Sequence, residues 1–234
     1  MGNLIFVDAS TYEGVQSWAI VLQSIFDLVP IVLFLVGSVV LLRSLYNKMV
    51  KGAYVLLAGG SIMIFISGVL KAIHKLLIGI AEIDYVILDK QFTPTSSIGF
   101  LLIFVALLGM FTKFNKDYTK VRSFTLPLLL TPLLTISTYD NSMIFVVIMA
   151  LGAAGMLGML IYMSARLKSI ASIILFSVAI VAMLGMGYLS TKGSFDKAWI
   201  QISVNCVYQG CFMTGVLILN KKYGLGKEDV FYKE

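Results

Sequence analysis

The sequence has few of the residues from which proteins build metal centres and acid–base pairs. It contains one histidine, two cysteines and only 13% charged residues in 234 positions, whereas ordinary soluble domains carry about 25% charged residues. Cys206 and Cys211 stand five positions apart in one apolar run, so a helix places them on different faces and we expect no disulfide between them. No run contains a nucleophile–base spacing or a metal cluster, so we predict no catalytic activity, no metal and no cofactor.

Apolar residues are what the chain has in excess. Hydrophobic residues make up 59% of the sequence, more than a soluble domain of this length can bury, so we predict that the lipid bilayer is its main partner. No soluble domain separates from the rest, and we expect one all-α domain over residues 1–234. We predict seven transmembrane helices, over residues 15–42, 52–80, 96–111, 124–138, 143–165, 169–189 and 198–219.

The fourth of these runs is the least regular. A bilayer of about 30 Å needs a helix of about 20 residues, whereas the run 124–138 is shorter and includes Pro127 and Pro132. Proline removes a backbone hydrogen bond and kinks or breaks a helix. Six spans and one irregular or re-entrant segment are therefore the alternative to seven full spans.

The basic residues indicate how the chain is oriented. Cytoplasmic loops carry an excess of Lys and Arg. With the N-terminus outside, most of the basic residues fall inside, at Arg43, Lys48, Lys51, Lys113, Lys116, Lys120, Arg122, Arg166, Lys168, Lys221, Lys222, Lys227 and Lys233. The acidic residues outside are Asp8, Glu13, Glu82, Asp84, Asp89, Asp140 and Asp196. We therefore predict a protein of the cell membrane with its N-terminus on the outer side and its C-terminus on the inner side. We interpret the net charge of +6 as a signal of this topology and not as a nucleic-acid site.

Four ionisable residues interrupt the predicted spans, namely Asp27, Lys71, His74 and Lys75. Such residues are costly in a membrane and usually face the bundle interior or water. With a rise of about 1.5 Å per residue, Asp27 lies about 24 Å above the inner end of its helix, and Lys71 lies at about the same height. Both are therefore expected in the outer third of the membrane, beneath His74 and Lys75.

The seventh run adds a polar stripe at a similar depth. Gln201, Asn205 and Gln209 follow one another at four-residue spacing, so they share one face of a helix. In a serpentine seven-helix bundle the first helix usually touches the second and the seventh. We therefore predict an outward-facing site between helices 1, 2 and 7 for a small polar or anionic solute or ion, lined by Asp27, Lys71, His74, Lys75, Gln201, Asn205 and Gln209.

Structural roles compete with this interpretation. Lys71 and Lys75 are close enough to the outer headgroups for their ammonium groups to snorkel there. Asp27 and Lys71 can instead form a purely structural ion pair that fixes the helix register. The amides of the seventh run are typical of polar contacts between membrane helices.

Two other functions remain open. Seven spans with the N-terminus outside resemble rhodopsin-like receptors and light-driven pumps in architecture only. The seventh run has no lysine that could form a retinal Schiff base, so the receptor alternative is a sensor without retinal.

Ala150, Ala154 and Gly158 stand at the four-residue spacing that lets helices approach closely. These three residues predict a contact with a second copy or a membrane partner, and hence an accessory subunit. Gly59 and Gly60 predict close helix packing in the same way.

Overall fold

The computed structural model describes residues 15–49, 51–111, 142–190 and 195–223, and within these ranges it contains helices and no strand. The predicted all-α class is therefore confirmed for the described part of the chain. The predicted fourth span, residues 124–138, lies outside it. The helices are α1 (Ser17–Leu45), α2 (Lys51–Ala81), the short α3 (Val86–Lys90), α4 (Phe92–Phe111), α6 (Ser142–Arg166), α7 (Ile170–Ser190) and α8 (Phe195–Tyr223).

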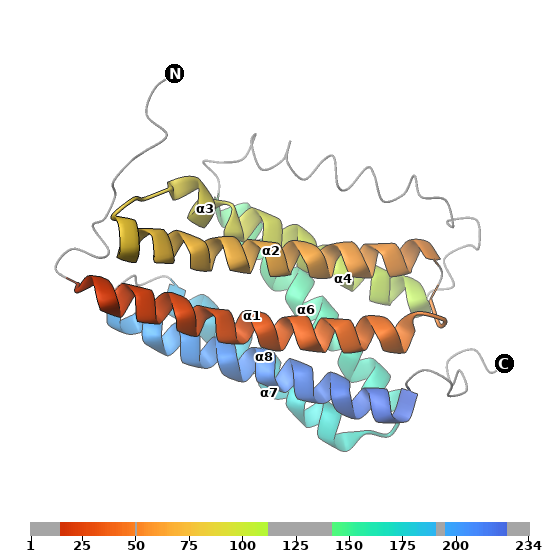
Figure 1. The fold of residues 1–234 in the computed structure, drawn as a ribbon. Coiled ribbons are helices and arrows are strands. Elements are labelled where there is room, and N and C mark those ends of the chain that lie inside the picture. The colour runs from red at the N-terminus through yellow and green to blue at the C-terminus, as the bar shows by residue number, and fades with distance from the viewer. Residues whose placement is uncertain (1–14, 50, 112–141, 191–194, 224–234) are drawn as a thin grey trace.

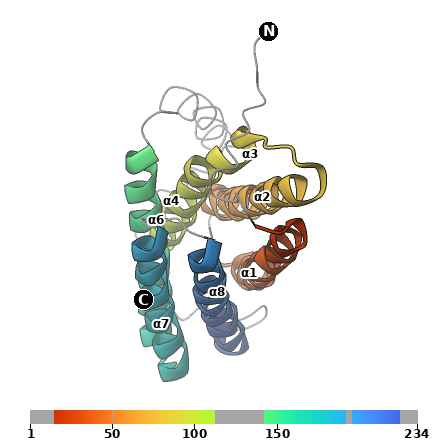
Figure 2. The ribbon, with the colours of Figure 1, turned by 90° about the vertical axis from the view of Figure 1, so that its left-hand side faces the viewer.

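The six long helices lie side by side and pack in a cyclic order (Figures 1 and 2). Each contacts two neighbours, in the sequence α1, α2, α4, α6, α7, α8 and back to α1. A single apolar core fills the space that they enclose, and its fully buried members include Leu57, Leu107, Leu157, Phe176 and Phe212. The first helix therefore touches the second and the last, as the sequence predicted.

Contacts between helices fix their relative directions. Gly152 of α6 lies against Leu101 of α4, and Gly155, one turn later, lies against Phe104, so α4 and α6 are parallel. Figure 1 shows α1, α4, α6 and α8 running in one direction and α2 and α7 in the other. As a consequence, α4 finishes at the opposite end of the bundle from the point where α6 begins.

The outward surface of the helices is apolar, as contact with lipid requires. Among the described residues, five segments are long and apolar enough to cross a membrane, and the apolar part of α7, Ile170–Met186, is somewhat shorter. Large apolar side chains on the outer face of α1 are exposed, among them Leu22, Ile25, Val29, Val32 and Val36. Trp18 is 66% exposed at one end of this face and Tyr46 is 61% exposed at the other, as in the aromatic belts of membrane proteins. The chain therefore has the helical architecture of a multi-pass membrane protein.

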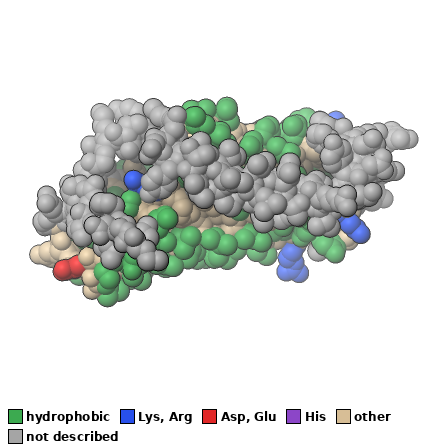
Figure 3. Space-filling view, turned by 90° about the horizontal axis from the view of Figure 1, so that it is seen from above, with side chains coloured by type: hydrophobic (Ala, Val, Ile, Leu, Met, Phe, Trp, Pro, Cys, Tyr) green, Lys and Arg blue, Asp and Glu red, His purple; other side chains and the backbone are tan. Residues whose placement is uncertain are grey.

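The two ends of the bundle differ in charge. All the acidic side chains that the structure describes, Asp27, Glu82, Asp84 and Asp89, belong to the end where α1 begins and α2 finishes, here called the acidic end. The opposite, basic end is where α1, α6 and α8 finish. Figure 3 shows basic side chains gathered mostly at that end. It carries Arg43, Lys48, Lys51, Arg166, Lys168, Lys221 and Lys222.

The turn between α6 and α7 contains a residue in an unfavourable backbone conformation. Lys168 has φ of 51°, and the N–H of Ser169 donates to the carbonyl of Ser164 at 2.8 Å, which is the hydrogen bond of a Schellman cap. Glycine adopts this conformation without a steric cost. We expect Lys168→Gly to raise the free energy of unfolding by up to about 1 kcal/mol in a zwitterionic detergent, measured by thermal unfolding. Lys168→Ala is the control, and equal stabilisation by both would contradict the prediction.

Candidate functional site

An ion pair joins α1 and α2 near the acidic end. The Nζ of Lys75 lies 2.5 Å from the Oδ2 of Asp27, and both side chains are largely buried. The hydroxyl of Ser24, one turn before Asp27, donates to the carbonyl of Ala72 at 2.7 Å and fixes the register of the two helices. The sequence predicted a meeting of Asp27 with Lys71, and the structure corrects this, because Asp27 pairs with Lys75 whereas the ammonium group of Lys71 is turned toward Phe92 of α4.

Lys71 has a different neighbour. Its Nζ lies 4.4 Å from the centre of the Phe92 ring, at the start of α4, in a cation–π contact. Such a contact stabilises by about 0.5 to 2 kcal/mol, more where the cation is desolvated. Lys71 therefore lies in the contact between α2 and α4, one turn deeper in the membrane than the ion pair.

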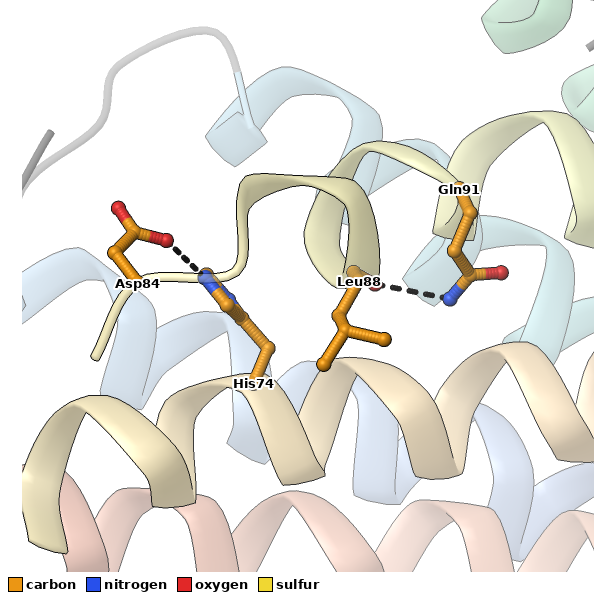
Figure 4. A network of polar contacts seen from close by, with 4 residues as sticks. All are labelled: His74, Asp84, Leu88 and Gln91. Carbon is orange, nitrogen blue, oxygen red and sulfur yellow. Dashed lines mark hydrogen bonds and ion pairs between the residues drawn. The ribbon is translucent and has the colours of Figure 1, made fainter. Parts of the chain in front are cut away.

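The side chain of His74 binds the loop that follows α2. Its Nε2 lies 2.6 Å from the Oδ1 of Asp84, which precedes α3, and both residues are buried (Figure 4). In the same segment, the side-chain amide of Gln91 donates to the carbonyl of Leu88 at 2.9 Å and to that of Ser67 at 3.3 Å. These bonds hold α3 against α2. The structure therefore gives His74 a structural role at the edge of the predicted site.

The polar stripe of α8 faces the bundle in part. Gln209 is buried, whereas Gln201 and Asn205 are half-buried. The rings of Phe26, next to Asp27 in α1, and Trp199 of α8 have their centres 5.6 Å apart, so this stretch of α1 packs beside the start of α8. The structure thus brings Asp27 and Lys75 together, and α8 packs against α1 beside them. That these residues and the α8 stripe bind a solute stays a prediction.

Several buried polar atoms on α1 and α8 have no hydrogen-bond partner among the described residues. They are both amide atoms of Gln23, the hydroxyl of Tyr208 and the side-chain oxygen of Gln209. Gln23 is 0% exposed and precedes Asp27 by one helical turn. An amide buried without a partner costs several kcal/mol. These atoms therefore require a partner from outside the described chain, which water or a polar solute can supply.

Sequence reasoning missed Gln23 as a member of the site. Its position four residues before Asp27 was a usable signal, because residues at that spacing share a face of a helix. Apolar residues surround Gln23 in the sequence of α1, and the structure buries its side chain completely.

An aromatic layer closes the polar region on the side of the basic end. Phe34 of α1 lies against Phe100 of α4 and Phe212 of α8, with ring centres 6.3 and 5.7 Å apart, and all three are buried. Phe34 is seven residues beyond Asp27, or about 10 Å further along the helix axis. Beyond the layer, α1 buries Ser38 and then Ser44, and the side chains of Ser44 and Asn220 are hydrogen-bonded at 2.6 Å.

The small residues of α6 divide between two faces. Gly152 and Gly155 lie against Phe100, Leu101 and Phe104 of α4. The predicted contact residues Ala150 and Gly158 are exposed and Ala154 is half-buried, and no described atom lies within 4 Å of a Cβ added at Gly158. The predicted stripe is thus on the outward face of α6 as far as the chain is described.

Neither metal chemistry nor a known family accounts for the polar region. In the described ranges no three His, Cys, Asp or Glu side chains are grouped so that they could hold a metal ion. No family model matches the chain, and no curated protein or solved structure matches it. Only the residues of this chain therefore bear on its function.

Proposed function

We propose that the protein is a seven-span membrane protein, with its N-terminus outside, that binds a small polar solute at the acidic end and passes it across the cell membrane. The parallel direction of α4 and α6 supports an odd number of crossings, because the chain between them joins opposite ends of the bundle. The concentration of Lys and Arg at the basic end supports an orientation with that end inside.

The buried amide of Gln23 is the observation that carries this proposal. A glutamine that is 0% exposed and has no described partner for either amide atom offers one donor group and one acceptor to a bound molecule. Tyr208 and Gln209 offer further unpartnered atoms on α8. Binding sites for small molecules typically combine a few such polar groups with apolar walls, and the Phe34 layer supplies a wall here.

The charges of the region indicate the class of solute. Lys75 is neutralised by Asp27, and Lys71 lies on the ring of Phe92. The ion pair, one helical turn from Gln23, carries no net charge and the charge of Lys71 is directed toward α4, so the region around Gln23 favours a solute without net charge, such as a polyol, an amide or a zwitterion. Asn205 and Gln201 are half-buried on α8 and would line the path of the solute from the outer surface to Gln23.

A thermal-shift experiment on the purified chain tests this proposal. A ligand that binds only the native state stabilises it by about 2.7 kcal/mol at a hundred times its Kd. We expect at least one solute from a panel of polyols, sugars, amides and amino acids to raise the unfolding temperature, and we expect Gln23→Leu to abolish that shift.

A matched control separates binding from folding. Ser164 is buried near the basic end, and its hydroxyl donates to the carbonyl of Leu160 in its own helix. Ser164→Ala should therefore retain the full ligand-induced shift. A panel in which no solute stabilises the wild-type chain would contradict the proposal.

The outward stripe of α6 favours a second candidate, an accessory subunit of a membrane complex. Ala150, Ala154 and Gly158 present small side chains to the surroundings of the described bundle, and such faces permit close approach of another helix. A silent solute panel combined with a stable oligomer in mild detergent would support this candidate over the first.

A further inference from the structure

A cluster of cations is assembled at the basic end from two parts of the chain that are distant in sequence. The Nζ of Lys222, at the end of α8, donates to the carbonyls of Lys168 at 3.1 Å and Leu167 at 3.4 Å. These bonds hold the last turn of α8 against the turn that joins α6 to α7. They bring together Arg166, Lys168, Lys221 and Lys222, a group that we term the cationic patch.

The cationic patch is exposed, and its charge is uncompensated among the described residues. All four of its side chains are exposed. The acidic side chains that the structure describes belong to the other half of the bundle, and Asp27 lies 16 residues before Arg43 in α1, or about 24 Å along the helix axis. The hydrogen bond between Ser44 and Asn220 also brings the last turn of α1, with Arg43, beside α8. The potential around this end is therefore strongly positive and attracts anions.

Exposed apolar side chains adjoin the cationic patch. Ile170, two residues after Lys168, is 72% exposed, and Ile174 on the next turn of α7 is 57% exposed. On α8, Leu217 is exposed one turn before Lys221. The surface thus changes within a single helical turn from positive charge to a face suited to hydrocarbon.

We infer that the cationic patch binds the phosphate headgroup of an anionic phospholipid, whose acyl chains lie along Ile170, Ile174 and Leu217. A charged headgroup joined to hydrocarbon matches both parts of this surface, whereas a nucleic acid or a free anion matches only the cations. Lys and Arg make short, charge-assisted hydrogen bonds to phosphate oxygens. This inference depends on insertion in a membrane and is independent of the proposed solute site.

Lipid binding to the full chain in detergent tests the inference. Native mass spectrometry would compare phosphatidylglycerol with phosphatidylcholine on the wild type and on the variant Arg166→Gln/Lys168→Gln/Lys221→Gln. Lys222 is left in place because it closes the turn. Each cation contributes about 1 kcal/mol of attraction at an anionic surface, so the triple variant should bind phosphatidylglycerol about a hundred-fold more weakly. Its binding of phosphatidylcholine should not change.

A charge-conserving variant provides the matched control. Arg166→Lys/Lys168→Arg/Lys221→Arg should retain the preference for phosphatidylglycerol, which a merely structural role of the three side chains would not predict. Equal binding of the two lipids by the wild type would overturn the inference, even if the neutral variant failed to fold. Displacement of phosphatidylglycerol by an equal concentration of inorganic phosphate would also overturn it, because the site would then be one for a free anion.

Discussion

Replacing Gly60 by alanine is expected to lower the free energy of unfolding by about 2 to 3 kcal/mol, the upper range for overpacking a well-filled interior. A Cβ at this position would lie 2.5 Å from the carbonyl oxygen of Gly99 and 2.9 Å from the side chain of Ile103. The oxygen belongs to the backbone of α4, which cannot rotate out of the way. The helices α2 and α4 would have to separate, and equilibrium unfolding in mixed detergent would measure the cost.

Gly158→Ala is the matched control for this substitution. No described atom lies within 4 Å of the added Cβ, so only the intrinsic helix preference changes, which favours alanine by up to about 1 kcal/mol. The two identical chemical changes should therefore alter stability in opposite directions. Equal losses at Gly60 and Gly158 would show that glycine acts in this bundle through the backbone and not through helix contacts.

The two glycines also show how far small residues in a sequence predict helix packing. The prediction of close packing at Gly60 is confirmed, because the residue contacts α4. Spacing marked Ala150, Ala154 and Gly158 for a contact with a second copy or a membrane partner, and this face lies outward, whereas Gly152 and Gly155 make the contact with α4. The rotation of a helix about its axis depends on all its neighbours, and both sets of residues had suitable spacing.

Most of the helices could be predicted from hydropathy, whereas several of their ends could not. The segment between the second and third apolar runs was expected to be a loop, but it holds α3, and α4 begins at Phe92, four residues before the predicted start. Likewise α8 runs from Phe195 to Tyr223, past both ends of its apolar run. Hydropathy changes where the bilayer ends, whereas backbone hydrogen bonds continue a helix into the headgroup region.

The region of the candidate site could be predicted, but not its pairings. Depth along each helix follows from the rise per residue, so the common level of Asp27 and the α8 stripe was accessible from the sequence. Lys71 and Lys75 share a face of α2, and a third helix decides which of them meets Asp27, because Phe92 at the start of α4 takes the ammonium group of Lys71. The place of α4 beside α2 is a property of the packed bundle and cannot be obtained from the sequences of α1 and α2 alone.

Lys75→Met is expected to destabilise the protein by about 3 to 5 kcal/mol, because it leaves the carboxylate of Asp27 buried without its partner. Asp27→Leu should cost a similar amount by leaving the ammonium group of Lys75 unpaired. The double variant Asp27→Leu/Lys75→Met removes both charges, and apolar replacement of a buried pair is often neutral or stabilising. Equilibrium unfolding of the three variants forms a double-mutant cycle that measures the coupling.

Lys71→Met identifies the partner of Asp27 independently. Its Nζ lies on the ring of Phe92, so the loss should be about 0.5 to 2 kcal/mol, and it should be the same with Asp27 or Leu at position 27. A large loss that disappears in the Asp27→Leu background would instead make Lys71 the partner that the sequence predicted.

The double variant Asp27→Leu/Lys75→Met also separates stability from function. If it is as stable as the wild type but solute no longer raises its unfolding temperature, the ion pair contributes to the binding site. If solute raises its unfolding temperature as in the wild type, the pair is a structural connection between α1 and α2.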